Sequence, residues 1–112
     1  MTKSVLPEEL AATLGQVQVI DVRRRPAFET SPSMVSGAVW RNPDDVAQWM
    51  ATIERNRPVV VYCVHGHEVS QGCADFLENS GLNARYLVGG FDKWAQEKRP
   101  VVMKYEGRDA RG

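Results

Sequence analysis

The sequence lacks the features that mark several large classes of protein. No apolar run approaches the ~20 residues that span a bilayer. Lys plus Arg and Asp plus Glu number 14 each, so the formal net charge is zero. This balance gives no reason to expect nucleic acid or a membrane surface as a partner. Two cysteines in 112 residues do not form a disulfide framework, and there is no internal repeat or low-complexity segment.

The first residues also lack the apolar core of a signal peptide. The segment MTKSVLPEELAATLG carries two glutamates instead, so we expect a cytoplasmic protein. The composition, with 43% hydrophobic and 25% charged residues, is that of an ordinary globular domain. We predict a single domain over residues 1–105 and a flexible tail over residues 106–112.

Short β-branched runs alternate with segments of helical periodicity. The runs at 17–22, 38–40, 59–64 and 84–88 predict strands, whereas 23–37 predicts a loop with at most one helical turn. Helices are predicted at 7–14, from Asn42 to Arg57, between 70 and Gly81, and from a cap at Asp92. This alternation predicts an α/β fold with a parallel sheet and helices on both faces. Ligands of such sheets bind at the carboxyl ends of the strands.

The stretch CVHGHEVS at 63–70 follows the most apolar predicted strand and precedes a predicted helix. A cysteine attacks as a thiolate, and the N–H groups at a helix N-terminus favour that thiolate. A tight loop can aim its own amides at the same sulfur and bind an anion there. Gly66 permits such a turn, and His65 and His67 can add hydrogen-bond donors or positive charge.

Cys63, His65, His67 and Glu68 superficially resemble a cluster of metal ligands. Structural zinc sites take ligand pairs from two segments, and no second pair exists here, so we expect no metal site. The other cysteine, Cys73, lies on an apolar helical face with Val69, Phe76 and Leu77. We interpret Cys73 as a core residue, and a resolving thiol for Cys63 is the alternative.

Four motifs, in order, resemble those of the single-domain rhodaneses, a family of sulfurtransferases. They are IDVR at 20–23, SGAV at 36–39, VVVYC at 59–63 with a glycine at 66, and YLVGGF at 86–91 followed by a tryptophan at 94. Together they cover about residues 5–97. Each motif alone is common, but the ordered set is specific.

The resemblance implies a five-stranded parallel sheet flanked by helices on both faces. It implies that Cys63 takes a sulfane sulfur from thiosulfate or a persulfide and passes it to a thiol, a protein or another thiophilic acceptor, without a cofactor. It assigns Asp21 and Arg23 a structural role. The expected binding loop for the persulfide and the donor anion consists of Val64, His65, Gly66, His67, Glu68, Val69 and Ser70.

The loop departs from the usual family pattern in length. Gly81 follows Cys63 by 18 positions where family members usually have 17, which predicts a seven-residue loop over 63–69. Longer loops resemble those of phosphatases and arsenate reductases of this fold, but those enzymes carry an arginine where this chain has Val69. An oxyanion-handling enzyme of that kind is therefore the alternative function, together with a persulfide carrier or binding module that does not turn over.

Overall fold

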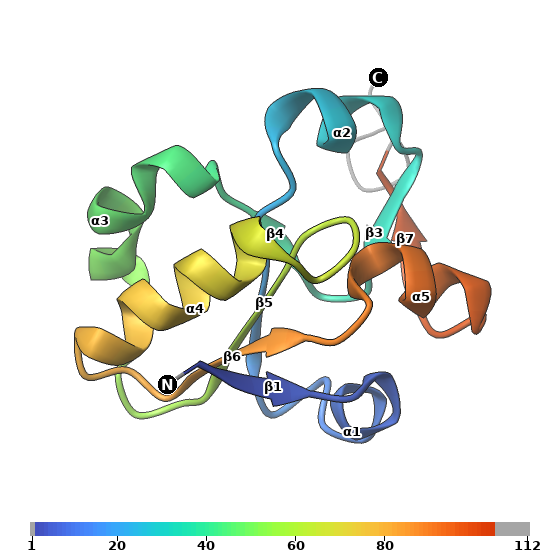
Figure 1. Cartoon of the computed structure of the whole chain (residues 1–112). Helices are drawn as coiled ribbons and strands as arrows, with labels where there is room; N and C mark the ends of the chain where they lie inside the picture. Colours follow the sequence, from blue (N-terminus) through green and yellow to red (C-terminus); the bar gives the residue numbers. More distant parts are fainter. Residues whose placement is uncertain (1, 105–112) are drawn as a thin grey trace.

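A five-stranded parallel sheet forms the centre of the protein. The computed structural model describes residues 2–104. The strand order is β1 (Lys3–Val5), β6 (Ala84–Leu87), β5 (Val59–Tyr62), β2 (Gln18–Asp21) and β4 (Val39–Trp40), with every neighbouring pair parallel (Figure 1). The predicted α/β fold and its five-stranded sheet are confirmed. β5 is the middle strand, so its carboxyl end lies at the centre of the sheet edge.

Helices cover both faces of this sheet, as Figure 1 shows. α1 (Pro7–Ala12) and α5 (Gly90–Gln96) cover one face, and α3 (Val46–Trp49) and α4 (Glu68–Asn79) cover the other. α2 (Arg25–Thr30) lies beyond one end of the sheet, near a small antiparallel ladder of β3 (Ser33–Val35) and β7 (Val101–Met103). Two 3₁₀ turns, η1 (Pro43–Asp45) and η2 (Met50–Thr52), flank α3.

β5 divides its side chains between two hydrophobic cores. Val59 and Val61 pack in the core beneath α4, whereas Val60 and Tyr62 pack in the core beneath α1 and α5. Successive side chains of a strand point to opposite faces, so a strand covered on both sides is apolar at every position. All four residues of β5 are buried, and this confirms the interpretation of its sequence.

The structure corrects several elements predicted from the sequence. β1, β3 and β7 were not expected, because three-residue strands that are partly exposed are too short to display a period. The predicted loop over 23–37 contains both α2 and β3. The single helix expected from Asn42 is split into η1, α3 and η2, because i→i+3 hydrogen bonds at Asp45 and Ile53 tighten its two ends.

The apolar face predicted for α4 is narrower than expected. Cys73 and Leu77 are buried as predicted, but Phe76 is 40% exposed. Phe76 instead lines a hollow between α4 and the segment that contains η1. This exposed aromatic side chain is therefore not part of the core.

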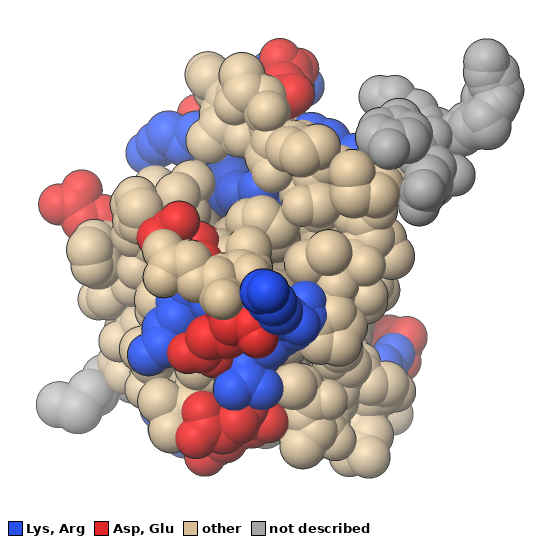
Figure 2. Space-filling view, turned by 90° about the vertical axis from the view of Figure 1, so that its right-hand side faces the viewer, with Lys and Arg blue, Asp and Glu red and all other residues tan. Residues whose placement is uncertain are grey.

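Charges are mixed on the face of the molecule shown in Figure 2, where acidic and basic side chains lie interspersed without a large area of one sign. In the part of the chain that the structure describes, no helix has the length and apolar character needed to cross a membrane. The predicted tail over 106–112 and residue 105 lie outside the described residues.

Candidate active site

Cys63 lies directly after β5, at the carboxyl end of the central strand. Its side chain is buried, with 6% of its surface exposed. Its thiol donates a hydrogen bond to Oγ of Ser70 in the first turn of α4, with an Sγ–Oγ distance of 3.1 Å. The strand and the helix therefore hold the sulfur between them. This is the edge of the sheet where ligands of parallel α/β proteins bind.

The loop after Cys63 is shorter than predicted, because α4 begins at Glu68 rather than at Ser70. The first hydrogen bond of the helix runs from N–H of Gln71 to the carbonyl of His67, at 3.0 Å. The N–H groups of Glu68, Val69 and Ser70 therefore have no acceptor within the helix. The extra residue of this segment extends the first turn of α4, and these three amides lie at a helix N-terminus.

Hydrogen bonds to α5 orient the peptide groups of the loop. The carbonyl of Cys63 accepts from N–H of Phe91 at 2.8 Å, and the carbonyl of Val64 accepts from N–H of Asp92 at 2.9 Å. A trans peptide directs its C=O and the following N–H to opposite sides. The N–H groups of Val64 and His65 therefore point away from α5. Asp92 thus binds the loop through its backbone, and the N-cap of α5 is Gly89 rather than the predicted Asp92.

Gly66 and Gly90 allow the loop and the start of α5 to approach closely. Both have positive φ angles, of 76° and 61°. A Cβ atom on Gly90 would lie 2.4 Å from the carbonyl oxygen of Cys63, and one on Gly66 would lie 2.7 Å from the carbonyl oxygen of Leu87. Side chains at either position are therefore excluded by sterics as well as by backbone conformation.

A cavity of about 620 Å³ opens above the loop. It brings together most of the residues predicted for the binding loop and three residues from the segment after β2. Gly66 and Ser70 do not line it and are buried, as is Asp21. The residues that line the cavity are Arg23, Arg24, Ala27, Cys63, Val64, His65, His67, Glu68 and Val69.

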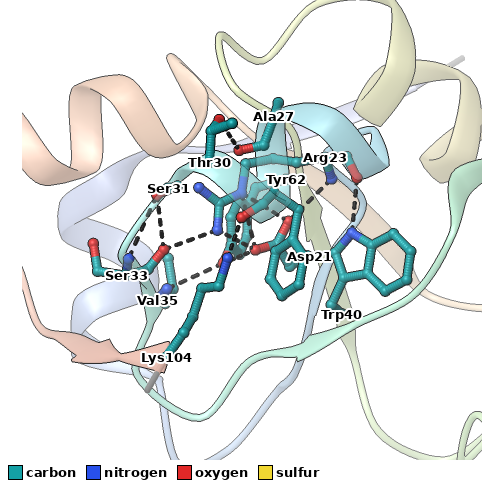
Figure 3. Close-up of polar contacts among 11 residues, drawn as sticks. Asp21, Arg23, Ala27, Thr30, Ser31, Ser33, Val35, Trp40, Tyr62 and Lys104 are labelled. Carbon is teal, nitrogen blue, oxygen red and sulfur yellow. Dashed lines mark hydrogen bonds and ion pairs between the residues drawn. The ribbon is translucent and has the colours of Figure 1, made fainter. Parts of the chain in front are cut away.

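Asp21 and Arg23 form a buried ion pair next to the site (Figure 3). Nη2 of Arg23 lies 2.7 Å from Oδ2 of Asp21 and donates to the carbonyl of Ser33 at 2.9 Å. Asp21 also accepts from the hydroxyl of Tyr62 at 2.8 Å, and that hydroxyl accepts from N–H of Val35 at 3.1 Å. The pair therefore connects β2, β3 and β5, and Tyr62 directly precedes the cysteine.

Tyr62 and Arg23 make further interactions in this network. Burial raises the pKa of Tyr62 well above its usual value, and the Asp21 carboxylate raises this pKa further. The phenol therefore stays protonated and donates to Asp21. The guanidinium of Arg23 lies over the ring of Phe91, 4.4 Å from its centroid. Nη1 of Arg23 has no hydrogen-bond partner among the described residues, although this residue lines the cavity.

Asp21→Asn will lower the free energy of unfolding by about 3 kcal/mol, because it leaves the buried guanidinium of Arg23 without a counter-charge. Urea denaturation followed by circular dichroism measures this loss. Glu54→Gln is the matched control, since it removes the carboxylate of an exposed pair with Arg57 at 3.3 Å. That control will change stability by at most about 1 kcal/mol. Equal losses in the two variants would contradict the structural role of Asp21.

Arg24 is a cavity residue that the sequence analysis missed. It belongs to a run of three arginines, which is usually a solvated loop. Its side chain is 61% exposed and forms an ion pair with Asp44 at 3.2 Å, while Arg23 beside it is buried. One signal was available: β2 and β5 are parallel neighbours, so the residues after both strands meet at one edge of the sheet.

Cys73 is the second buried thiol of the protein. Burial, followed by the proximity of Cys63, raises the pKa of Cys73 from 9.0 to about 11. The thiol therefore stays protonated at neutral pH, and a protonated thiol is a poor nucleophile. This favours the interpretation of Cys73 as a core residue over that of a resolving thiol.

The raised pKa of Cys73 makes stability fall at high pH. The unfolded thiol ionises above pH 9 and the folded thiol only near pH 11. Ionisation therefore lowers the free energy of the unfolded state relative to the folded state as pH rises through this interval. We expect wild-type protein to lose about 2 kcal/mol more than Cys73→Ala between pH 8 and pH 11. Urea denaturation at a series of pH values measures the difference. Parallel stability profiles would contradict it.

No group of three or more His, Cys, Asp and Glu side chains within residues 2–104 is placed so that it could hold a metal ion. His65 and His67 are exposed on the loop, with ring centroids 6.2 Å apart. Nδ1 of His65 lies 3.9 Å from Oδ2 of Asp92, and that side-chain pair is also exposed. The two histidines thus line the mouth of the cavity.

The protein is a parallel α/β domain. At the carboxyl end of its central strand, a thiol lies beside the N-terminus of a helix. The family model of the rhodanese-like domain matches residues 6–97. The chain therefore belongs to the rhodanese family, a family of sulfurtransferases, as its motifs predicted.

Two comparisons with individual proteins agree with this assignment. The chain is 32% identical to the thiosulfate sulfurtransferase GlpE of Vibrio cholerae over 87 residues, which cover 77% of this chain and 79% of that protein. A rhodanese-related protein of Thermoplasma volcanium is 26% identical with a TM-score of 0.82, covering 91% of this chain and 99% of that one.

A third structure shares the fold alone. It is a protein of unknown function from Rhodopseudomonas palustris, described as a possible tyrosine phosphatase, with a TM-score of 0.80 and 18% identity, covering 90% of this chain and 85% of that one. Proteins described with different activities therefore share this architecture, and the chemistry of the site decides the function.

Proposed function

We propose that this protein is a sulfurtransferase that carries sulfane sulfur on Cys63, taking it from thiosulfate or a persulfide and passing it to a thiophilic acceptor. The observation that carries the proposal is a buried thiol that lies beside the amides of a loop and of a helix N-terminus and lines a cavity. The similarity to a thiosulfate sulfurtransferase supports the reaction class.

The reaction has two halves. The thiolate of Cys63 attacks the sulfane sulfur of thiosulfate, the S–S bond of the donor breaks, and sulfite leaves with its electron pair. A persulfide remains on Cys63. A thiophilic acceptor then attacks the outer sulfur, and the electron pair of that S–S bond returns to Cys63 as the thiolate.

The loop stabilises the anionic species of both halves. The N–H groups of Val64 and His65 face away from α5, and those of Glu68, Val69 and Ser70 begin α4. Amides that are fixed before reaction need no rearrangement when charge moves onto the outer sulfur. The Ser70 hydroxyl, 3.1 Å from Sγ, is placed to donate to the thiolate once Cys63 has lost its proton.

Initial rates test this mechanism. With thiosulfate as donor and cyanide as acceptor, a covalent carrier gives parallel lines in double-reciprocal plots, because each product leaves before the next substrate binds. Intersecting lines would contradict a persulfide intermediate. The same assay with an organic thiol in place of cyanide shows which acceptor the protein prefers. An organic persulfide in place of thiosulfate shows which donor it prefers.

Phosphatase or arsenate reductase activity remains the alternative hypothesis, together with a carrier that does not turn over. The loop has Val69 in place of the arginine of those enzymes, and Glu68 adds a negative charge to the cavity wall. p-Nitrophenyl phosphate and arsenate serve as substrates for the alternative enzymes. A single turnover of sulfur without steady-state transfer to any acceptor would favour the carrier.

Arg24 supplies the cationic side chain that the loop lacks. An exposed ion pair is weak, so Arg24 can leave Asp44 for an anion in the cavity. We expect Arg24→Gln to raise KM for thiosulfate by about three- to fivefold with little change in kcat. Asp44→Asn, which frees Arg24, will lower KM.

Arg25→Gln is the control for Arg24→Gln. Arg25 is an exposed neighbour that pairs with Glu29 at 3.7 Å and does not line the cavity. Steady-state kinetics at low and high salt separate the two positions, because the effect of Arg24 weakens as salt screens it. Equal KM values for both variants would show that Arg24 does not bind the donor.

A further inference from the structure

Gln71, near the start of α4, binds two consecutive carbonyl groups of the segment that precedes it. Its side-chain Nε2 donates a partly buried hydrogen bond to the carbonyl of Gly66 at 2.9 Å. Its backbone N–H donates to the carbonyl of His67 at 3.0 Å. Gln71 therefore holds the peptide groups on both sides of His67.

The helix alone does not fix the peptide group between Gly66 and His67. His67 is the N-cap residue of α4, and its φ of −104° and ψ of −129° are not helical. Gly66 has a φ of 76° and, as a glycine, can adopt many other conformations. Among the described residues, no backbone N–H donates to the carbonyl of Gly66. The side chain of Gln71 is therefore the contact that decides which way this peptide group faces.

The orientation of this peptide group affects the charge that an anion in the cavity meets. A trans peptide directs its C=O and the following N–H to opposite sides, so the N–H of His67 points away from Gln71. His67 lines the cavity, whereas Gly66 and Gln71 do not. If the peptide group turned over, the negative end of a carbonyl dipole would take the place of an N–H that favours an anion.

We propose that Gln71 is a positioning residue, which keeps the carbonyl of Gly66 out of the anion site and the N–H of His67 available to an anion at Cys63. This inference rests on the proposed function for the identity of that anion. Because Gln71 does not line the cavity, it acts on the anion through this peptide group. It holds the loop from the side of α4, opposite to the contacts that α5 makes with the carbonyls of Cys63 and Val64.

The ratio of two alkylation rates tests this role. The thiolate of Cys63 displaces iodide from iodoacetate, which is an anion, or from iodoacetamide, which is its neutral analogue. In each reaction an S–C bond forms, the C–I bond breaks, and iodide leaves with the electron pair. Both reactions use the same thiolate, so the ratio of their rate constants reports how the cavity treats the negative charge of the reagent. Protein with Cys73→Ala limits the reaction to Cys63.

Two substitutions remove the hydrogen bond to Gly66 in different ways. Gln71→Met keeps an unbranched side chain but has no N–H to donate. Gln71→Asn keeps the amide but is one methylene shorter, so the amide no longer reaches the carbonyl. We expect each to lower the ratio of iodoacetate to iodoacetamide rate constants by about tenfold, the effect of losing one hydrogen bond to a charged group.

Gln48→Met is the matched control, since Gln48 is an exposed glutamine of α3 that does not line the cavity. It will keep the wild-type ratio. An unchanged ratio in Gln71→Met or in Gln71→Asn overturns the inference, even if both rates fall, because an equal fall is what a purely structural role produces. If thiosulfate still loads sulfur onto Cys63 in that case, the proposed function stands. If the ratio falls as predicted but no donor loads Cys63, Gln71 positions the amide and the proposed function fails.

Discussion

Cys63→Ala abolishes sulfur transfer, with every donor and acceptor, while the protein remains folded. Because the proposed reaction passes through a persulfide on this sulfur, no other group can replace it. The side chain is buried, and its only hydrogen bond among the described residues is to Ser70, so its removal changes the free energy of unfolding by about 1 kcal/mol. The rate of thiocyanate formation from thiosulfate and cyanide measures the loss.

Cys73→Ala is the control for this experiment. It removes the other thiol of the chain, which is buried and protonated at neutral pH, and we expect it to retain transfer. If sulfur transfer survived in Cys63→Ala but was lost in Cys73→Ala, Cys73 would be the reacting thiol and the proposed mechanism would be wrong.

Gly90→Ala reduces kcat/KM by at least about a hundredfold, because displacement of reacting groups by about 1 Å has effects of that size. Its Cβ would lie 2.4 Å from the carbonyl oxygen of Cys63 and 2.5 Å from that of Val64. These are the two carbonyls that α5 holds in place. The substitution therefore moves the loop away from α5 and turns its amides from the cavity.

The same substitution also lowers stability, by about 2 kcal/mol, since a residue with a side chain is strained at a φ of 61°. Gly15→Ala is the matched control: a Cβ there meets nothing within 4 Å, and the site is distant in sequence from the loop. We expect it to leave activity and stability unchanged. Wild-type activity in Gly90→Ala would mean that the orientation of the loop amides does not matter for transfer.

The sequence predicted the central elements of the fold because their patterns are strong. β5 is apolar at every position, since both of its faces are covered, and Gly81 with its φ of 94° ends the helix that follows. β1, β3 and β7 escaped prediction because three residues show no period. Their pairing depends on residues distant in the sequence, such as Val35 opposite Val101.

The candidate site was predicted only in part. The position of Cys63 follows from local sequence, as a strand end before a helix. The start of α4 at Glu68 depends instead on how the loop packs against Gly90, which the local pattern does not contain. The same holds for Arg24, because its place in the cavity follows from the pairing of β2 with β5.

The intact mass of the protein after incubation with thiosulfate tests the central claim most directly. We predict the addition of one sulfur atom, mapped to the peptide that contains Cys63, absent in Cys63→Ala and removed by cyanide. Wild-type protein that gains no sulfur from thiosulfate or from any organic persulfide or thiosulfonate, or that gains it equally in Cys63→Ala, would contradict sulfur transfer through this cysteine.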